Sequence, residues 1–215
     1  CTVALPSTTL QAFPAWPVVP TAGTTGPIAD AAVAGGLDGR VALVVLPYRP
    51  GSAFIVKGFG SAVQEAGARG AAAIAVVTEG PTGEIIALNA DLARFAWRVP
   101  VVLLAGREAA RLRAAAAAGE RVTVRIDGTP IPGATAANVL ATRDPAPGAP
   151  AGTLVLTTPR SGWFACAGER GSGIAVFLSV AERLARHSRR RLLLAATSGH
   201  ELEGLGGEAL LRDHA

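Results

Sequence analysis

Several residue types and sequence features are scarce or missing in this chain of 215 residues. It contains no methionine, one lysine and two cysteines, and two cysteines are too few for a disulfide framework. No apolar run approaches the roughly 18 to 20 residues that a membrane-spanning helix needs. Since an initiator methionine and a basic segment before an apolar stretch are also missing, we expect that any signal peptide was removed or never included.

Common catalytic motifs are missing as well. The sequence has no Gly-x-Ser-x-Gly elbow, no Walker loop and no His-Glu-x-x-His pattern, which are the signatures of major hydrolase classes. The glycines of GERGSG (residues 168–173) fit a tight turn that opens a helix, so they do not require a phosphate ligand.

The net charge of +4 rests on arginine, which accounts for 19 of the 20 basic residues. These arginines are spread along the chain, and only Arg186 to Arg191 form a cluster. The cluster has no interleaved aromatic residues and lies between a predicted helix and a predicted strand. We therefore expect a solvated connection there and no nucleic-acid partner.

Half of the residues are hydrophobic, so the chain can bury a sizeable core. Residues 1–34 are rich in Pro, Thr and Gly without a sustained period, which predicts an extended lead-in with room for one short helix. We assign no chemistry to this segment.

Residues 35–127 alternate between short β-rich runs and helical stretches, which is typical of an α/β domain. The predicted strands are Val41–Leu46, Ala71–Val77, Val99–Leu104 and Arg121–Ile126, and the predicted helices are Ser52–Ala68 and Arg107–Ala118.

Residues 136–215 form a second, more regular series. A strand at Ala136–Thr142 is followed by a Pro/Gly-rich connection, Arg143–Gly152. After it come a strand, a helix, a strand and a helix, for which we expect parallel strands. Their predicted ranges are Leu154–Thr157, Gly171–His187, Arg191–Thr197 and Leu205–His214.

The first series resembles a protease-associated domain over Gly35–Asp127. The resemblance rests on the order GRVALVV, QEAGARGAAAIAVV, RVPVVLLAGREAARL and RVTVRI. It implies a non-catalytic lid or substrate-guiding module, so we expect no catalytic residue in this part.

The second series resembles the zinc exopeptidases of the MH clan, which include bacterial leucyl aminopeptidases, glutamate carboxypeptidases and the transferrin receptor. Two loops carry the resemblance, Thr157–Gly173 and Ser198–Gly206. It implies a small protease-associated α/β domain followed by the first part of a parallel-sheet zinc-exopeptidase domain. It also implies a peptide or protein ligand and an extracytoplasmic or secreted location.

The positions that bind two zinc ions in active members of that family are mostly altered here. Thr158 and Arg160 stand where the family has a His and its supporting Asp, and Gly168 replaces the Asp that bridges the metals. His200 replaces the general-base Glu, so Glu201 alone matches a ligand. Arg160 would also put a fixed cation beside the first metal.

The resemblance further implies an Asp and a His ligand on later strands, and the chain ends at Ala215 before such strands. We therefore expect a truncated domain. No cofactor is expected, and zinc would bind only if the altered site is active.

Two interpretations of the loops remain open. One is a non-catalytic binding protein on a peptidase-like scaffold. The other is a hydrolase, either a metallopeptidase that uses His200 and Glu201 or a metal-free enzyme with Cys166 as nucleophile and His200 as base. Cys166 also fits a buried structural role.

Overall fold

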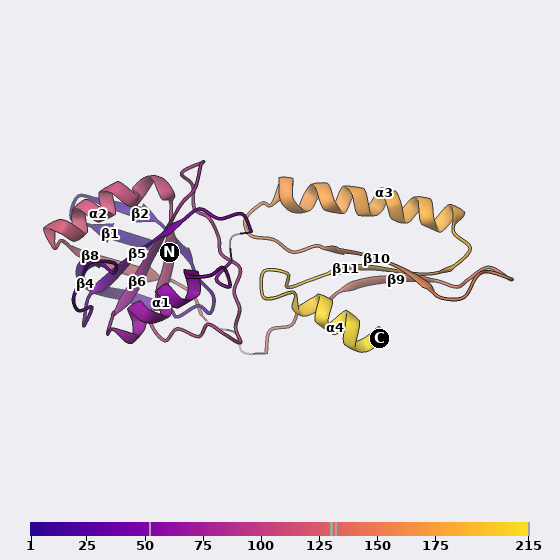
Figure 1. The fold of residues 1–215 in the computed structure, drawn as a ribbon, viewed down its shortest axis with the longest axis horizontal. Coiled ribbons are helices and arrows are strands. Elements are labelled where there is room, and N and C mark those ends of the chain that lie inside the picture. Colours follow the sequence, from indigo (N-terminus) through magenta and orange to yellow (C-terminus); the bar gives the residue numbers. More distant parts are fainter. Residues whose placement is uncertain (52, 130, 132, 215) are drawn as a thin grey trace. The chain divides into compact units, whose positions relative to one another are not determined.

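The structure is a computed structural model that describes residues 1–51, 53–129, 131 and 133–214. It divides into two compact units, Cys1–Pro132 and Gly133–Ala215. Both are α/β (Figure 1). Among the described residues, no helix is long and apolar enough to cross a membrane.

The first unit contains one mixed sheet of eight strands in the order β2-β1-β8-β4-β5-β6-β7-β3. Strands β4 to β7 run parallel at its centre, and β8, β1, β2 and β3 add antiparallel pairs. The elements of this unit are β1 (Thr2–Leu5), β2 (Thr8–Gln11), β3 (Phe13–Pro14), β4 (Thr21–Asp30), β5 (Val41–Pro47), α1 (Phe59–Ala68), β6 (Ala73–Glu79), β7 (Val101–Leu104), a 3-10 turn (Gly106–Glu108), α2 (Ala109–Ala118) and β8 (Arg121–Ile126).

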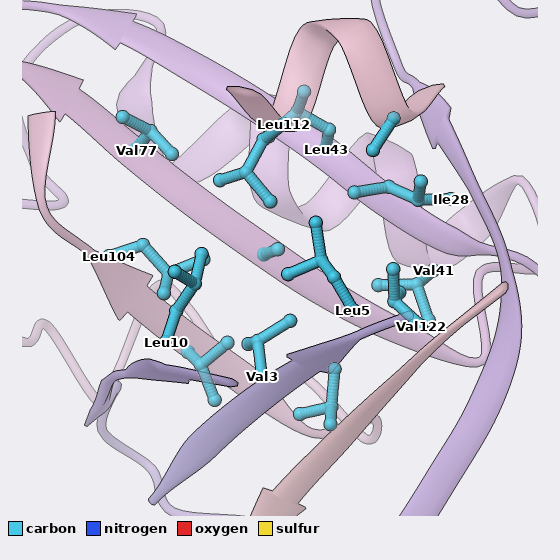
Figure 2. Packing of buried hydrophobic residues seen from close by; sticks show 14 of the residues in the cluster. Val3, Leu5, Leu10, Ile28, Val41, Leu43, Val77, Leu104, Leu112 and Val122 are labelled. Atoms are coloured by element: carbon cyan, nitrogen blue, oxygen red, sulfur yellow. The ribbon is translucent and has the colours of Figure 1, made fainter. Parts of the chain in front are cut away.

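The central strands bury side chains on both faces, because successive residues of a strand point to opposite sides. In β5, Val41 and Leu43 pack in one core cluster and Ala42 and Val44 in the other. Helix α2 covers the first cluster through Leu112, and α1 covers the second. Figure 2 shows side chains of β1, β2, β5 and α2 converging in the first cluster.

The expectation of an extended lead-in at residues 1–34 is wrong. Strands β1 to β4 lie in this segment and pair within the sheet, so the first unit begins at Cys1. The sequence concealed β4 because its ten residues consist largely of Thr, Ala and Gly with one Pro. Such residues give no clear apolar alternation.

The two helices of the first unit are shorter than expected. We expected the first over Ser52–Ala68, but α1 begins at Phe59, after Gly58 in the left-handed conformation with a φ of 92°. Ser52 itself lies outside the described residues. The predicted helix Arg107–Ala118 starts as the 3-10 turn and continues as α2.

The second unit is a three-stranded sheet in the order β10-β11-β9. Strands β10 and β11 are parallel, as expected, and β9 runs antiparallel to β11. Figure 1 shows α3 along one face of this sheet and α4 on the other. The elements are β9 (Val139–Arg143), β10 (Thr153–Pro159), a π-helical turn (Ala167–Gly171), α3 (Ser172–His187), β11 (Arg191–Thr197) and α4 (Leu205–His214).

Arg143 holds the end of α3 at the end of β9. Its guanidinium donates hydrogen bonds to the carbonyl groups of Leu184, Ala185, Ser188 and Arg190. The last carbonyls of a helix have no partner within the helix. Leu184 and Ala185 belong to the last turn of α3, so Arg143 adds donors at this helix end.

The arginine cluster is tied to the Pro/Gly-rich connection and is not simply solvated. Arg189 and Arg190 donate to the carbonyls of Pro147 and Ala151, at 2.6 Å each. Arg191 forms an ion pair with Asp144 at 3.2 Å. These contacts fix the connection between β9 and β10.

We expect a fragment of residues 1–132 to fold alone and a fragment of residues 133–215 to fail. The first contains two complete core clusters, whereas the cluster of the second consists of Leu193, Ala195 and Leu210. Burial of apolar surface is the main favourable contribution to folding, so a cluster this small supplies little stability. Thermal unfolding followed by circular dichroism should be cooperative for the first fragment only, and a cooperative transition in the second would contradict this expectation.

Candidate functional site

The candidate site lies in the second unit, where two loops follow the parallel strands β10 and β11. Pro159 and Thr197 are partners at the ends of these strands, and the amide of Arg160 donates to the Thr197 carbonyl at 2.8 Å. The two loops therefore start side by side at the carboxyl edge of the sheet. Ligand-binding groups of α/β folds collect at this edge.

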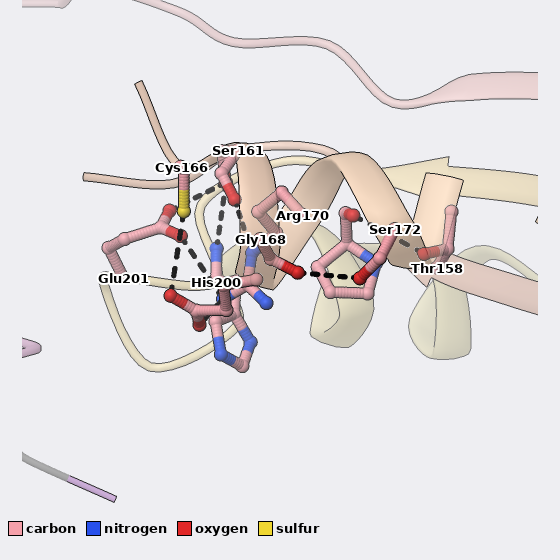
Figure 3. Close-up of polar contacts among 10 residues, drawn as sticks. Thr158, Ser161, Cys166, Gly168, Arg170, Ser172, His200 and Glu201 are labelled. Carbon is pink, nitrogen blue, oxygen red and sulfur yellow. Dashed lines mark hydrogen bonds and ion pairs between the residues drawn. The ribbon is translucent and has the colours of Figure 1, made fainter. Parts of the chain in front are cut away.

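Glu201 is the buried acid of the site, with 6% of its surface exposed. Its Oε2 accepts a hydrogen bond from Ser161 Oγ at 2.6 Å, and Ser161 Oγ accepts one from the His200 amide at 3.3 Å. Glu201 Oε1 is buried and has no hydrogen-bond partner in the part of the chain that the structure describes. The two loops are thus joined through the Ser161 hydroxyl (Figure 3).

Arg170 supplies a positive charge beside this carboxylate. Its Nη2 lies 3.5 Å from Glu201 Oε1 and 2.7 Å from Glu169 Oε1. Its Nε donates to the Ser161 carbonyl at 2.6 Å. The Arg170 side chain is 13% exposed, so the guanidinium is held among oxygen atoms from three residues.

Cys166 is half-buried. Its geometry favours neither a fully buried structural cysteine nor a catalytic nucleophile. Its Sγ donates to Glu169 Oε2 at 3.5 Å. Burial, together with this hydrogen bond to Glu169, raises the pKa of the Cys166 thiol. Within the described residues, no hydrogen bond joins Cys166 to His200, so the pair lacks the geometry of a nucleophile and its base.

His200 and Glu201 are neighbours in sequence with different surroundings. The His200 side chain is exposed, and its contact with the site comes from the backbone amide. Glu201 alone of the two carries its side chain into the cluster.

The other positions of the expected metal site have taken structural roles. Thr158 is buried and its hydroxyl donates to the Pro159 carbonyl at 3.4 Å. The Gly168 carbonyl accepts from Ser172 Oγ at 2.6 Å. Arg160 donates from Nη2 to the Ala137 carbonyl at 2.6 Å, and the cation beside Glu201 is Arg170.

These residues do not fit a zinc pair. Across the described ranges, no group of three or more His, Cys, Asp or Glu side chains is arranged to hold a metal ion. Each oxygen of Glu201 already faces a positive or donor group, Ser161 on one side and Arg170 on the other. A structural zinc site needs four ligands and a catalytic one at least three.

Sequence reasoning missed the groups that build the cluster, above all Ser161 and Gly162. A Cβ at Gly162 would lie 2.4 Å from Cys166 Sγ and 3.0 Å from Arg170 Cγ. Glycine is therefore required where this loop passes the start of α3. The SG pair after β10 was the only signal in the sequence, and it does not distinguish a close approach from an ordinary turn.

Asn138 was also missed, and it fixes the second loop. Its Nδ2 donates to the Gly206 carbonyl at 2.8 Å and its Oδ1 accepts from the Ser198 amide at 3.0 Å. The side chain thereby links the end of β11 to the start of α4.

Comparison with solved structures identifies the fold. No protein-family model matches the chain, and no curated protein matches it in sequence. A structure of BSAP, a zinc aminopeptidase from Bacillus subtilis, matches 100% of this chain and 51% of its own with a TM-score of 0.72 at 20% identity. A medium-resolution structure of the same enzyme matches 100% and 52%, with a TM-score of 0.73 at 19% identity.

This likeness shows a zinc aminopeptidase-like fold, as the resemblance of the second series suggested. The chain spans about half the length of the solved structures it matches.

We expect Cys166 to react slowly with iodoacetamide at pH 7. Since its pKa is raised, the protonated thiol dominates and the rate should climb about tenfold per pH unit through pH 9. In a Cys1→Ser background, Glu169→Gln should speed the reaction, because Glu169 helps to raise the pKa. A plateau below pH ~7 that His200→Ala abolishes would instead reveal a thiolate and imidazolium pair.

Gly162→Ala should destabilise the protein by about 1 to 3 kcal/mol, the range for overpacking a tight contact. The added methyl group would collide with Cys166 and Arg170. Gly168→Ala is the matched control in the same loop, because a Cβ there meets no atom within 4 Å and should change stability by less than about 0.5 kcal/mol. Urea unfolding measures both, and equal effects would refute the close approach.

Proposed function

We propose that this chain is a peptidase-like scaffold that binds a peptide or protein partner and lacks the catalysis of a dinuclear zinc peptidase. The observation that carries the proposal is the state of Glu201, the one acid that matches an expected ligand position. Its carboxylate is buried and faces Ser161 and Arg170.

The remaining positions support the same conclusion. Thr158 offers only a hydroxyl that bonds to the backbone, and Gly168 has no side chain. A dinuclear site needs several oxygen and nitrogen donors together with a base that takes a proton from metal-bound water. The described residues of the two loops offer one buried carboxylate and one exposed imidazole at the corresponding positions.

We also propose a role for the first unit and a location for the protein, both of which follow from the family resemblance. The first unit would act as a protease-associated domain that guides the peptide or protein partner, and the protein would work outside the cytoplasm. Binding of unfolded peptides by a fragment of residues 1–132 would support the first of these proposals.

A second candidate is a hydrolase with an altered site built on His200 and Glu201. The observation in its favour is Glu201 Oε1, which is buried and accepts no hydrogen bond among the described residues. Exposed His200, next to it in sequence, could serve as a further ligand or base.

The purified chain should bind no pair of zinc ions and should not hydrolyse aminoacyl chromogenic substrates. Elemental analysis after dialysis against zinc would test the first statement, and a hydrolysis assay at several pH values the second, with the Bacillus subtilis aminopeptidase as positive control. Glu201→Gln should leave the background rate unchanged. Two tightly held equivalents of zinc, with turnover that Glu201→Gln abolishes, would establish the hydrolase instead.

A further inference from the structure

The guanidinium of Arg170 sits at a point on which oxygen atoms from both loops converge. These atoms are the Ser161 carbonyl at 2.6 Å from Nε, Glu169 Oε1 at 2.7 Å from Nη2 and Glu201 Oε1 at 3.5 Å from Nη2. Two of the three belong to carboxylates. Such an arrangement of oxygen atoms can bind a cation, and here the Arg170 guanidinium occupies that position.

A buried carboxylate needs a compensating positive charge, because removal of its hydration is costly. Glu201 has 8% of its side chain exposed, and its Oε1 accepts no hydrogen bond from any residue that the structure describes. The cation beside that oxygen is Arg170. In a zinc peptidase, a metal ion would provide this charge.

We propose that Arg170 replaces the metal as the cation of this site and keeps divalent ions out. A fixed positive charge 3.5 Å from Glu201 Oε1 repels a second cation at the same oxygen. An arginine side chain stays protonated at any physiological pH. The chain itself therefore supplies a permanent positive charge to this site, which offsets one of the two carboxylate charges.

The local backbone is shaped to place Arg170 there. Residues Ala167–Gly171 form a single π-helical turn, and the amides of Arg170 and Gly171 both donate to the Cys166 carbonyl. Cys166 has a φ of 49°, in the left-handed region that side chains rarely occupy. Turns of this π type concentrate at functional sites, and this one turns Arg170 from the helix start toward Ser161.

The exposed pair Arg186 and Glu182 on α3 provides a control of the same chemistry. It is also an arginine–glutamate ion pair within the second unit, but its side chains are 69% and 63% exposed. Loss of this pair leaves no buried charge, so it should have little effect on stability.

The test measures zinc affinity by titration calorimetry and the melting temperature with zinc and with a chelator. The unmodified chain should melt within about 1 °C under both conditions, since no metal contributes. Arg170→Met should melt several degrees lower, and zinc should raise its melting temperature again. Its zinc affinity should exceed that of the unmodified chain at least ~10-fold, because two carboxylates lose their shared cation.

Three further variants define the mechanism. Arg170→Met with Glu201→Gln should lose the gained zinc affinity, Arg170→Lys should not gain it because the charge remains, and Arg186→Met should behave like the unmodified chain. If Arg170→Met does not fold, Arg170→Gln replaces it, because an amide keeps a donor without the charge. Zinc binding by Arg170→Met or Arg170→Gln no tighter than by the unmodified chain would overturn the inference, as would an equal gain in Arg170→Lys.

This inference rests on the proposed function, and the two can fail separately. Zinc-dependent turnover by the unmodified chain would refute the proposed function. An inactive, zinc-free chain whose Arg170 variants gain no zinc affinity would refute only the role of Arg170.

Discussion

The buried carboxylate of Glu201 constrains everything around it in the second unit. Because it lies away from water, donors and a positive charge must reach it, and both come from the loop after β10. That loop must fold back over the start of α3, which requires Gly162 at its closest point and a left-handed backbone at Cys166. The burial of one charge thus goes together with a close approach at Gly162 and a left-handed backbone at Cys166.

The predictability of the fold varied with how the strands are buried. Strands such as β5 and β6 are covered on both faces, so their sequences are continuous apolar runs that identify them. Strand β4 consists mainly of small residues and threonine, and β1 has only four residues. Both strands pair with β8, which lies far along the chain, so no local pattern reveals their place in the sheet.

The sequence indicated the two candidate loops but not how their side chains are arranged. The parallel pair β10 and β11 directed attention to these loops, and Glu201 was singled out from its position after β11. Arg170 could not be assigned, because its direction depends on the π-helical turn and on Gly162. The sequence suggested that Arg160 supplies a positive charge near the site. Its side chain instead donates to the Ala137 carbonyl, and Arg170 is the arginine beside Glu201.

The strong preference for arginine over lysine in this chain has a consequence for its response to the medium. Many guanidinium groups bond to neutral main-chain carbonyls, and ion pairs are only part of their contacts. Examples are Arg69, Arg143, Arg160, Arg170, Arg189 and Arg190. Dissolved salt screens attraction between exposed charges far more than it weakens a short hydrogen bond to a carbonyl. These bonds should therefore persist at ionic strengths that screen the exposed ion pairs, and lysine, which lacks the planar fork, could not take over these positions.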